Sequence, residues 1–326
     1  MSKRPATLHD VAALVGVSAR TVSRVVRSEG GCSPDTRERV LAAIDQLGYR
    51  PNVHARGLIS GRSGSLGFVI PVLSDPFFPE LAEGVQRSAH DAGLTVLFAM
   101  SGADPDVQHD VLSSLEGHHP EGVVVFPAQG GTEPLVPFLD RGMPMVVVDA
   151  EIEHPNAVSV RSDLADGARQ AVCHLLARGC RQLAMLVPFD FDVERQRPEA
   201  FSASLPGGME TVLIDAPNTF EGGMSGMETV LSERADVDGV FCFNDVMAIG
   251  AIQTAHKAGK SIPDDIAVVG FDDVQVGAVI SPALTTIRID RQRLGSAAID
   301  QVRALSNGDG GRSVVLPVEL IQRASA

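Results

Sequence analysis

From Leu66 onward, the chain alternates short apolar runs with segments of helical periodicity. Runs typical of buried strands lie at 67–72, 94–100, 122–126, 145–149, 183–187, 211–215, 239–243 and 266–270, and helix patterns lie near 78–92, 106–117, 163–178, 220–233 and 245–258. Regular alternation of this kind favours parallel sheets covered by helices on both faces, the α/β class. With 326 residues, the chain is long enough for a small head followed by two lobes.

Parallel sheets bind ligands at the carboxyl ends of their strands, so the residues just after each apolar run are candidates for a site. Four polar residues occupy such positions, namely Asp75, Asp149, Asn244 and Asp272. Aromatic faces are offered nearby by Phe77, Phe78 and Phe220. Carboxylates and amides beside rings are expected of a cleft for a polyhydroxyl ligand. Each aspartate alone could equally be a helix cap or a loop acid, and it is the group that indicates a sugar-like effector.

Residues 7–27 indicate two short helices joined by a Gly-Val-Ser turn. Thr7 suits the N-cap of the first helix, Gly16 its end, and Ser18 the cap of the second. The first helix carries an apolar stripe of Leu8, Val11, Ala12 and Val15, and the second buries Val22, Val25 and Val26. The polar face of the second helix consists of Arg20, Thr21, Ser23, Arg24 and Arg27. Two helices in this arrangement are a device for entering the major groove of DNA.

A third helix is predicted from Ser33-Pro34 to just before Gly48, with Val40, Leu41, Ile44 and Leu47 closing a small core. The alternative is a packing module whose arginines are only a solvated face. Charge favours DNA binding, because residues 1–62 contain ten Lys and Arg against five Asp and Glu, whereas the whole chain has a net charge of −14. A basic head on an acidic body predicts a local nucleic-acid site.

Several short motifs of the sequence resemble those of a known protein family. They are DVA (10–12), GVS (16–18), TVSRV (21–25), SPDTRERV (33–40), GYRPN (48–52), DPFF (75–78), RPEAF (197–201), FNDVMAIGA (243–251), IPDDIAVVGFDD (262–273) and PALTTIRID (282–290). In this order they resemble the lactose-repressor (LacI/GalR) family of transcription regulators over nearly the full length. The resemblance implies an all-α helix-turn-helix headpiece (1–50), a hinge helix and linker (51–64), and a two-lobed α/β periplasmic-binding-protein-like effector domain (65–326). Lobe one is expected at about 65–160 and 290–317, and lobe two at about 161–289 and 318–326.

The resemblance also assigns roles to residues. DNA contacts are expected from Thr7, Ser18, Ala19, Arg20, Thr21, Ser23, Arg24, Asn52, His54, Ala55, Arg56 and Leu58. Arg20 is the candidate to grip a guanine, and Leu58 the candidate to enter a minor-groove step from a hinge helix that folds only on the operator. For that segment a plain flexible linker is the alternative. Effector contacts are implied at the four polar positions named above, and Arg197 is added to them.

Three departures leave the identity of the effector open. Ala150 stands where many sugar-responsive relatives carry an arginine, Ile289 where some carry a glutamine, and Asp75 where asparagine is usual. Losing a bidentate donor and gaining an acid changes which hydroxyls or charges fit.

The function expected is that of a homodimeric repressor on double-stranded, inverted-repeat operator DNA, controlled by a small sugar or sugar derivative. An activator, or a corepressor-dependent regulator responding to a nucleoside or other metabolite, is the alternative. The sequence reaches LIQRASA soon after the last expected strand, and no leucine heptads follow. A tetramerising coiled coil is therefore not expected, and a dimer is. An enzyme is disfavoured by the lack of GxSxG, GxxxxGK[ST] and GxGxxG motifs, and a transported-solute receptor by the lack of a secretory signal. A cytoplasmic protein without membrane contact is expected, because the N-terminal residues form no apolar signal core and no apolar run approaches the length that spans a bilayer. No cofactor is expected, and no metal, since the four cysteines, Cys32, Cys173, Cys180 and Cys242, form no CxxC pair.

Overall fold

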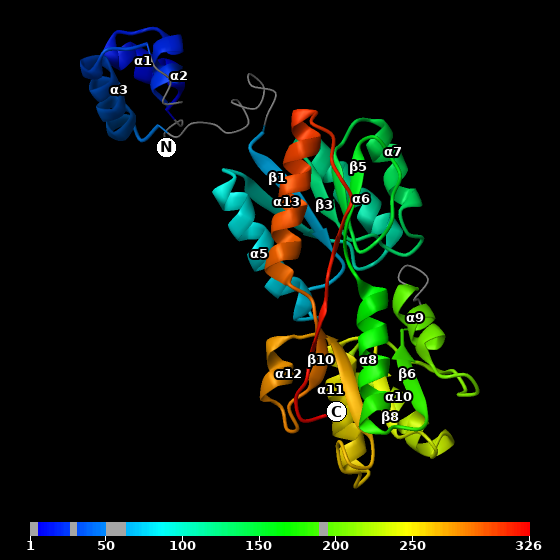
Figure 1. The fold of residues 1–326 in the computed structure, drawn as a ribbon. Helices are drawn as coiled ribbons and strands as arrows, with labels where there is room; N and C mark the ends of the chain where they lie inside the picture. The colour runs from blue at the N-terminus through cyan, green and yellow to red at the C-terminus, as the bar shows by residue number, and fades with distance from the viewer. Residues whose placement is uncertain (1–5, 27–30, 50–62, 189–194) are drawn as a thin grey trace. The chain divides into compact units, whose positions relative to one another are not determined.

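The computed structural model describes residues 6–26, 31–49, 63–188 and 195–326 (Figure 1). The chain forms two compact units, Met1–Gly64 and Ser65–Ala326. The candidate hinge residues Asn52, His54, Ala55, Arg56 and Leu58 lie outside the described residues.

The first unit contains three helices, α1 (Leu8–Val15), α2 (Ala19–Val26) and α3 (Pro34–Leu47). The predicted caps are confirmed. The Thr7 hydroxyl accepts a hydrogen bond from the Asp10 amide at 3.3 Å, while the Asp10 carboxylate accepts one from the Thr7 amide at 2.7 Å. Gly16 and Gly48 end their helices with φ of 74° and 61°, a conformation that favours glycine.

The core of this unit is small and aliphatic, and consists of Val11, Ala12, Val15, Val22, Val25, Val40 and Ala43. Two expectations for α3 are wrong, because Leu41 and Leu47 are 49% and 36% exposed. Leu41 follows the buried Val40 directly, and a step of one residue turns a side chain by about 100° around a helix. Ala43, three residues after Val40, takes the core position instead.

The second unit contains two six-stranded sheets, one in each lobe. The first has the strand order β11-β5-β4-β3-β1-β2, and all of its pairs are parallel. In chain order its strands are β1 (Ser65–Ile70), β2 (Thr95–Met100), β3 (Val123–Val125), β4 (Met145–Val148), β5 (Ala157–Ser162) and β11 (Val314–Leu316). Its helices are α5 (Phe77–Asp91), α6 (Pro105–Gly117), η1 (Glu133–Leu135), α7 (Val136–Asp140) and α13 (Arg291–Asn307).

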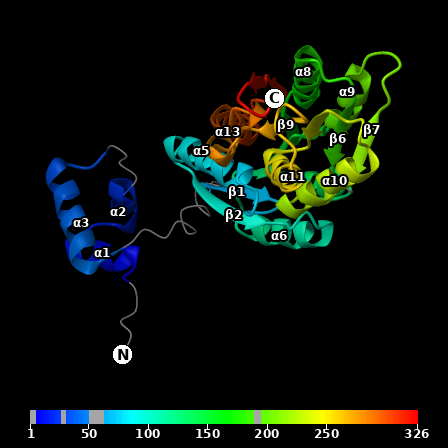
Figure 2. The ribbon, with the colours of Figure 1, turned by 90° about the horizontal axis from the view of Figure 1, so that it is seen from below.

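Helices cover both faces of this sheet, as Figure 2 shows for α5 and α6 on either side of β1 and β2. Along β1, Phe68 and Ile70 pack in one core cluster with Leu81 of α5, and Val69 packs in the other cluster with Leu112 of α6. Successive side chains of a strand point to opposite faces, so a strand covered twice is apolar throughout. This explains the uninterrupted apolar runs of the sequence.

The second sheet has the order β12-β10-β9-β8-β6-β7 and is parallel except for the β10–β12 pair. Its strands are β6 (Leu183–Val187), β7 (Val212–Asp215), β8 (Gly239–Cys242), β9 (Ala267–Asp272), β10 (Thr285–Arg288) and β12 (Glu319–Ile321). Its helices are α8 (Leu164–Arg178), α9 (Gln196–Ser204), α10 (Phe220–Glu233), α11 (Asp245–Lys257) and α12 (Gln275–Val279). The expected fold class, two α/β lobes behind a helical head, is confirmed.

The chain passes between the two sheets three times (Figure 1). The passages run from β5 to α8, from β10 to α13, and from β11 to β12. Each lobe is therefore assembled from distant parts of the sequence.

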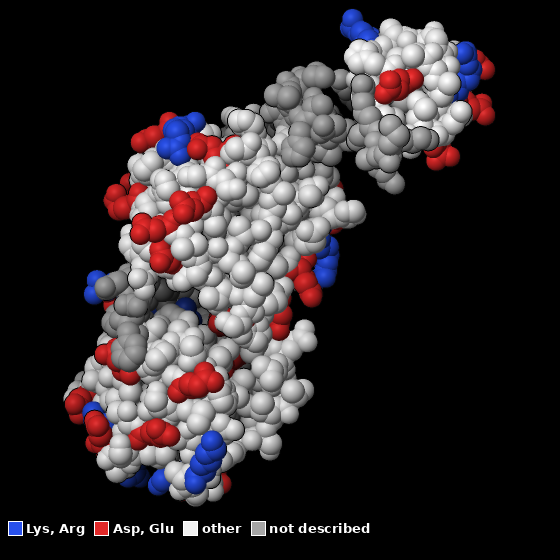
Figure 3. Space-filling model, turned by 180° about the vertical axis from the view of Figure 1, so that it is seen from behind, with Lys and Arg blue, Asp and Glu red and all other residues white. Residues whose placement is uncertain are grey.

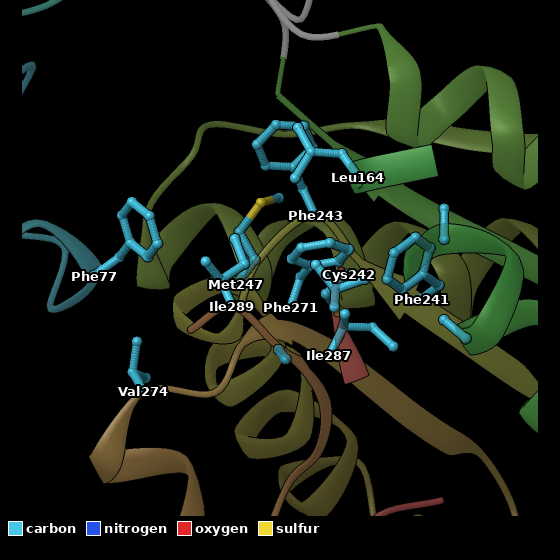
Figure 4. Packing of buried hydrophobic residues seen from close by; sticks show 14 of the residues in the cluster. Phe77, Leu164, Phe241, Cys242, Phe243, Met247, Phe271, Val274, Ile287 and Ile289 are labelled. Atoms are coloured by element: carbon cyan, nitrogen blue, oxygen red, sulfur yellow. The ribbon is translucent and has the colours of Figure 1, made fainter. Parts of the chain in front are cut away.

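The core of the second lobe contains large aromatic residues around its central strands (Figure 4). Phe241 lies 6.3 Å, between ring centroids, from both Phe201 and Phe271. On the other face, α10 and α11 cross with their backbones in contact. A Cβ added at Gly223 would lie 2.0 Å from the carbonyl oxygen of Met247, and one at Gly250 would lie 2.1 Å from that of Phe220. Only glycine permits this approach.

Candidate functional site

The second helix of the first unit presents its polar face as expected. Arg20 is exposed in the first turn of α2, and Ala19, Thr21, Ser23 and Arg24 are partly exposed. Arg20 forms no ion pair with any residue that the structure describes. Its guanidinium is available for bidentate recognition of a base edge.

Three of the hydroxyls assigned to DNA, those of Thr7, Ser18 and Thr21, have structural partners within the headpiece. The Ser18 hydroxyl accepts the Thr21 amide at 3.1 Å and lies 2.9 Å from the Thr21 hydroxyl. Thr7 caps α1 in the same way. These residues set the angle at which each helix begins, and any contact they make with DNA comes in addition to that role.

A cavity of about 470 Å³ lies in the second unit and is lined by residues of both lobes. Seven of the eight residues predicted to bind effector line it: Asp75, Phe77, Phe78, Asp149, Arg197, Asn244 and Asp272. Volumes of about 300–1,000 Å³ are usual for small-molecule sites. The carboxyl ends of strands in both sheets face this cavity, which is why residues far apart in sequence meet here.

Phe220 is not among the residues that line this cavity, and its contact with the effector stays a prediction. It is the first residue of α10, and its backbone carbonyl lies against Gly250 at the α10–α11 crossing. Pro217 and Asn218, in the loop before that helix, line the cavity instead.

Asn244 connects the two lobes. Its carboxamide oxygen caps α11 by accepting the Met247 amide at 3.0 Å. Its amide nitrogen donates to Asn218 Oδ1 at 2.7 Å and to Asp75 Oδ2, across the cleft, at 3.2 Å. The other oxygen of Asp75 accepts the Phe77 amide at 2.9 Å. Burial raises the pKa of Asp75, with the Phe77 amide and Arg197 acting in the opposite direction.

Asp149 and Arg197 are held by their own lobes. Asp149 Oδ1 accepts the Ser162 amide at 2.7 Å, and the residue has a φ of 53°. Arg197 is only 9% exposed and donates to the carbonyl oxygen of Phe243 at 2.6 Å. Its guanidinium lies 3.7 Å from the centre of the Phe243 ring and 4.8 Å from that of Phe271. Cation–π contact of this kind fixes a buried arginine in place.

Asp272 is the most deeply placed acid in the cavity. It is 6% exposed, and its φ of 105° lies in a region that favours glycine. Arg291 holds this turn by donating to the carbonyl oxygens of Asp272 and Asp273, and it also pairs with Glu80 at 2.7 Å. Burial raises the pKa of Asp272 well above its usual value, and the charge of Asp75 raises it further.

The remaining walls are largely apolar. Phe78 contacts Phe77 and Phe126 edge to face, with ring centroids 5.3 and 5.2 Å apart. Four of the apolar lining residues, Phe77, Leu164, Phe243 and Ile289, are labelled in Figure 4 among the packed hydrophobic side chains. Lining residues that sequence reasoning missed are Pro71, Ala103, Phe126, Pro127, Ala128, Gln129, Val148, Leu164, Pro188, Pro217, Asn218 and Phe243. Several follow predicted strands, so the rule that identified Asp75 would also have found Gln129 and Asn218.

Acidic side chains are spread over the surfaces of both lobes (Figure 3). Because the phosphate backbone repels such surfaces, DNA contact is expected from the first unit. No helix among the described residues is long and apolar enough to cross a membrane. The described part of the chain also brings together no group of three or more His, Cys, Asp or Glu side chains that could hold a metal ion.

A helix-turn-helix head with a two-lobed, ligand-binding α/β body defines a class of ligand-responsive DNA-binding proteins. Residues 7–52 match the family described as bacterial regulatory proteins, lacI family, and residues 172–326 match the periplasmic binding protein-like domain. A ribose operon repressor of Halalkalibacterium halodurans is 33% identical over 90% of this chain and 88% of its own. The transcriptional repressor PurR of Photobacterium profundum is 30% identical over 90% of each chain. A crystal structure of the Lac repressor dimer bound to operator and the anti-inducer ONPF is 27% identical, covers 99% of both chains, and has a TM-score of 0.89.

The chain belongs to the lacI family of bacterial transcription regulators. The family is one of DNA-binding regulators rather than enzymes.

Proposed function

We propose that this protein is a cytoplasmic transcriptional repressor whose affinity for an inverted-repeat operator is set by a small, sugar-like effector bound between the two lobes. The observation that carries the proposal is the cavity, which combines polar strand-end residues of both sheets with aromatic walls. The same chain carries an exposed arginine in the first turn of a helix-turn-helix. The Lac repressor, whose fold this chain shares, has been solved with an operator and a small ligand.

Control follows from the residues that line both sides of the cleft. Asp75 of lobe one and Asn244 of lobe two share a hydrogen bond, so a ligand that enters the cavity meets both lobes at once. A ligand changes an equilibrium only by binding one arrangement better than another. An effector that prefers one lobe arrangement would thereby change how two protomers present their headpieces.

The test is footprinting of the purified protein on its own upstream DNA, repeated with a panel of sugars and polyols. Protection of a palindrome that a panel member removes is the expected result. Protection that no ligand alters would contradict effector control, and equal affinity for random fragments at moderate salt would contradict sequence-specific binding.

Arg20→Ala should relax base preference at one symmetric position of each half-site. A bidentate arginine–guanine contact contributes about 1–3 kcal/mol of discrimination, so the affinity ratio between the preferred and the substituted base should fall about 5- to 150-fold. Binding-site selection or competition with single-base variants measures it. Arg37→Ala, on α3, is the charge-matched control and should change affinity without changing base preference. An unchanged preference in Arg20→Ala would show that another side chain reads the base.

We further propose that the dimer forms through the β2 edge of the first sheet. Phe98 and Met100 on this edge strand are 43% and 48% exposed, and Leu73, in the turn after β1, is 48% exposed. Exposed apolar side chains on an unpaired edge strand favour association with another chain. The Lac repressor in the structure named above is a dimer, which supports the same assembly here.

Met100→Glu should convert the dimer to monomer at micromolar concentration, because burying an unpaired carboxylate in an interface opposes association. Sedimentation velocity measures the change. Val315→Glu is the matched control, since Val315 is 51% exposed on β11, at the opposite edge of the same sheet. A Met100→Glu dimer, or a Val315→Glu monomer, would place the interface elsewhere.

A further inference from the structure

Among the residues that the structure describes, the charged ones that line the cavity are three acids and one base, namely Asp75, Asp149, Asp272 and Arg197. The cavity is otherwise bounded by rings, prolines, aliphatic side chains and the neutral amides Gln129, Asn218 and Asn244. In so apolar a setting an unbalanced charge is felt strongly, because little solvent screens it.

Two of these four charges are already matched within their own lobe. Arg197 is packed on two aromatic rings and donates to the Phe243 carbonyl oxygen. Asp149 accepts the Ser162 amide. Asp75 and Asp272, one from each lobe, lie close enough across the cavity for the charge of Asp75 to raise the pKa of Asp272.

Asp272 is the stronger indicator of the two. Asp272 lines the cavity and is 6% exposed, so it is more than nine-tenths buried. Its carboxylate has no hydrogen-bond partner among the described residues. Within the described ranges, Asp75 accepts hydrogen bonds from neutral donors, the amides of Phe77 and Asn244. A buried carboxylate without a donor is costly, so the site is built for a group that supplies one.

Charges of both signs surround the two acids. Asp272 is influenced by Asp75 and Asp245, which disfavour its ionised form, and by Arg197 and Arg291, which favour it. The same two arginines act on Asp75, against the nearby Glu80. Burial raises the pKa of both acids despite these arginines. A positive charge placed between the two acids would reverse that effect.

We propose that the effector bears a protonated amine that binds between Asp75 and Asp272, as in an amino sugar. This rests on the proposed function, because it specifies the chemistry of the effector in that same cavity. An ammonium group brings three hydrogen-bond donors and a positive charge, whereas a hydroxyl group brings one donor and no charge. The same arrangement disfavours phosphorylated or carboxylated metabolites, whose charge both acids repel.

The experiment is calorimetric titration of the full-length protein with matched sets of probes. D-glucosamine, D-galactosamine and D-mannosamine are compared with the corresponding neutral hexoses and with the hexose 6-phosphates. At least one amino sugar should bind about tenfold more tightly than its hexose, and the 6-phosphates should not bind. The same amino sugar should change the operator affinity in a gel-shift assay.

Asp75→Asn and Asp272→Asn should each weaken binding of the amine about 10- to 100-fold while changing binding of the neutral hexose much less. Glu83→Gln, an exposed substitution on α5, is the control and should leave both unchanged. Because an ammonium ion favours ionised carboxyls, affinity for the amine should rise with pH as long as the amine stays protonated, and it should rise less in Asp272→Asn, where Asp75 alone of the pair still titrates. Thermal melts verify that the variants are folded.

The outcomes separate this inference from the proposed function. A neutral hexose that binds as tightly as its amino sugar and releases the operator would overturn the amine and leave effector control standing. Tight binding of a hexose 6-phosphate would likewise overturn the amine and leave effector control standing. If no probe binds, the amino-hexose effector is wrong, and the footprinting panel of sugars and polyols decides separately on effector control.

Discussion

Gly250→Ala destabilises the second lobe by about 3 kcal/mol or more, because the added methyl group has no room at the α10–α11 crossing. Its Cβ would lie 2.1 Å from the carbonyl oxygen of Phe220 and 2.9 Å from the Met224 amide nitrogen. Both are backbone atoms of a helix and cannot rotate away. Relief requires that α10 and α11 separate, which opens the packing around Met247 and Val230. The urea midpoint of the second lobe should fall accordingly.

Gly117→Ala provides the control. Gly117 is the last residue of α6, and an added Cβ meets no heavy atom within 4 Å. Alanine restricts the unfolded chain more than glycine does, so this variant should be neutral or up to about 1 kcal/mol more stable. Equal stability of Gly250→Ala and the wild-type protein would mean that the two helices are not in backbone contact in solution.

The second large effect concerns Asp245, a fully buried acid at the start of α11. Its two oxygens accept the Thr286 hydroxyl at 2.5 Å and the Val274 amide at 2.8 Å. Burial raises its pKa to about 7, although both hydrogen bonds act to lower it. Asp245 thereby anchors the turn that carries Asp272 and Asp273.

Stability should therefore fall as pH rises. A carboxyl whose pKa is raised in the folded state holds its proton more tightly there than in the unfolded chain, so its contribution is present at low pH and is lost through about pH 7. Compared with wild type, Asp245→Asn should gain up to about 4 kcal/mol between pH 4 and pH 8. Urea unfolding at several pH values measures this difference.

The control for this pH effect is Asp110→Asn, an exposed position on α6, which should shift little relative to wild type over the same range. A constant difference between Asp245→Asn and wild type at all pH values would show that Asp245 is ionised throughout.

Local signals were sufficient to predict the helix caps and the long apolar strands. Thr7, Gly16, Ser33 and Gly48 cap the helices of the first unit as their residue types indicate. The apolar runs of β1, β4 and β6 form central strands because sheets covered on both faces require apolar residues on both.

Other strands could not be found in this way. β11 and β12 have three residues each, and in β5 the polar residues Ser159 and Arg161 each follow a valine. Such segments are strands because a neighbouring edge is available for pairing, which is a property of the tertiary fold rather than of the segment. Helices α9 and α13 were missed as well.

The location of the cavity could be predicted from the sequence, whereas the full set of its lining residues could not. The strand-end rule identified Asp75, Asp149, Asn244 and Asp272, all of which line it. It could not tell that Phe220 begins a helix whose first turn faces α11. Nor could it find the buried partners of the turn at Asp272, because Arg291 reaches it from the other lobe.

The three passages between the sheets have a consequence for how the protein is made on the ribosome. Helix α13 covers β3, β4 and β5, and β11 pairs with β5, yet these two elements are translated after nearly all of the second lobe. The apolar side chains of β4, which lie in one core cluster with Leu294 and Ile299, are therefore left uncovered while about 140 further residues emerge. Newly made lobe one can therefore complete its fold only after α13 and β11 have emerged, and until then its uncovered apolar strands offer a surface that chaperones bind.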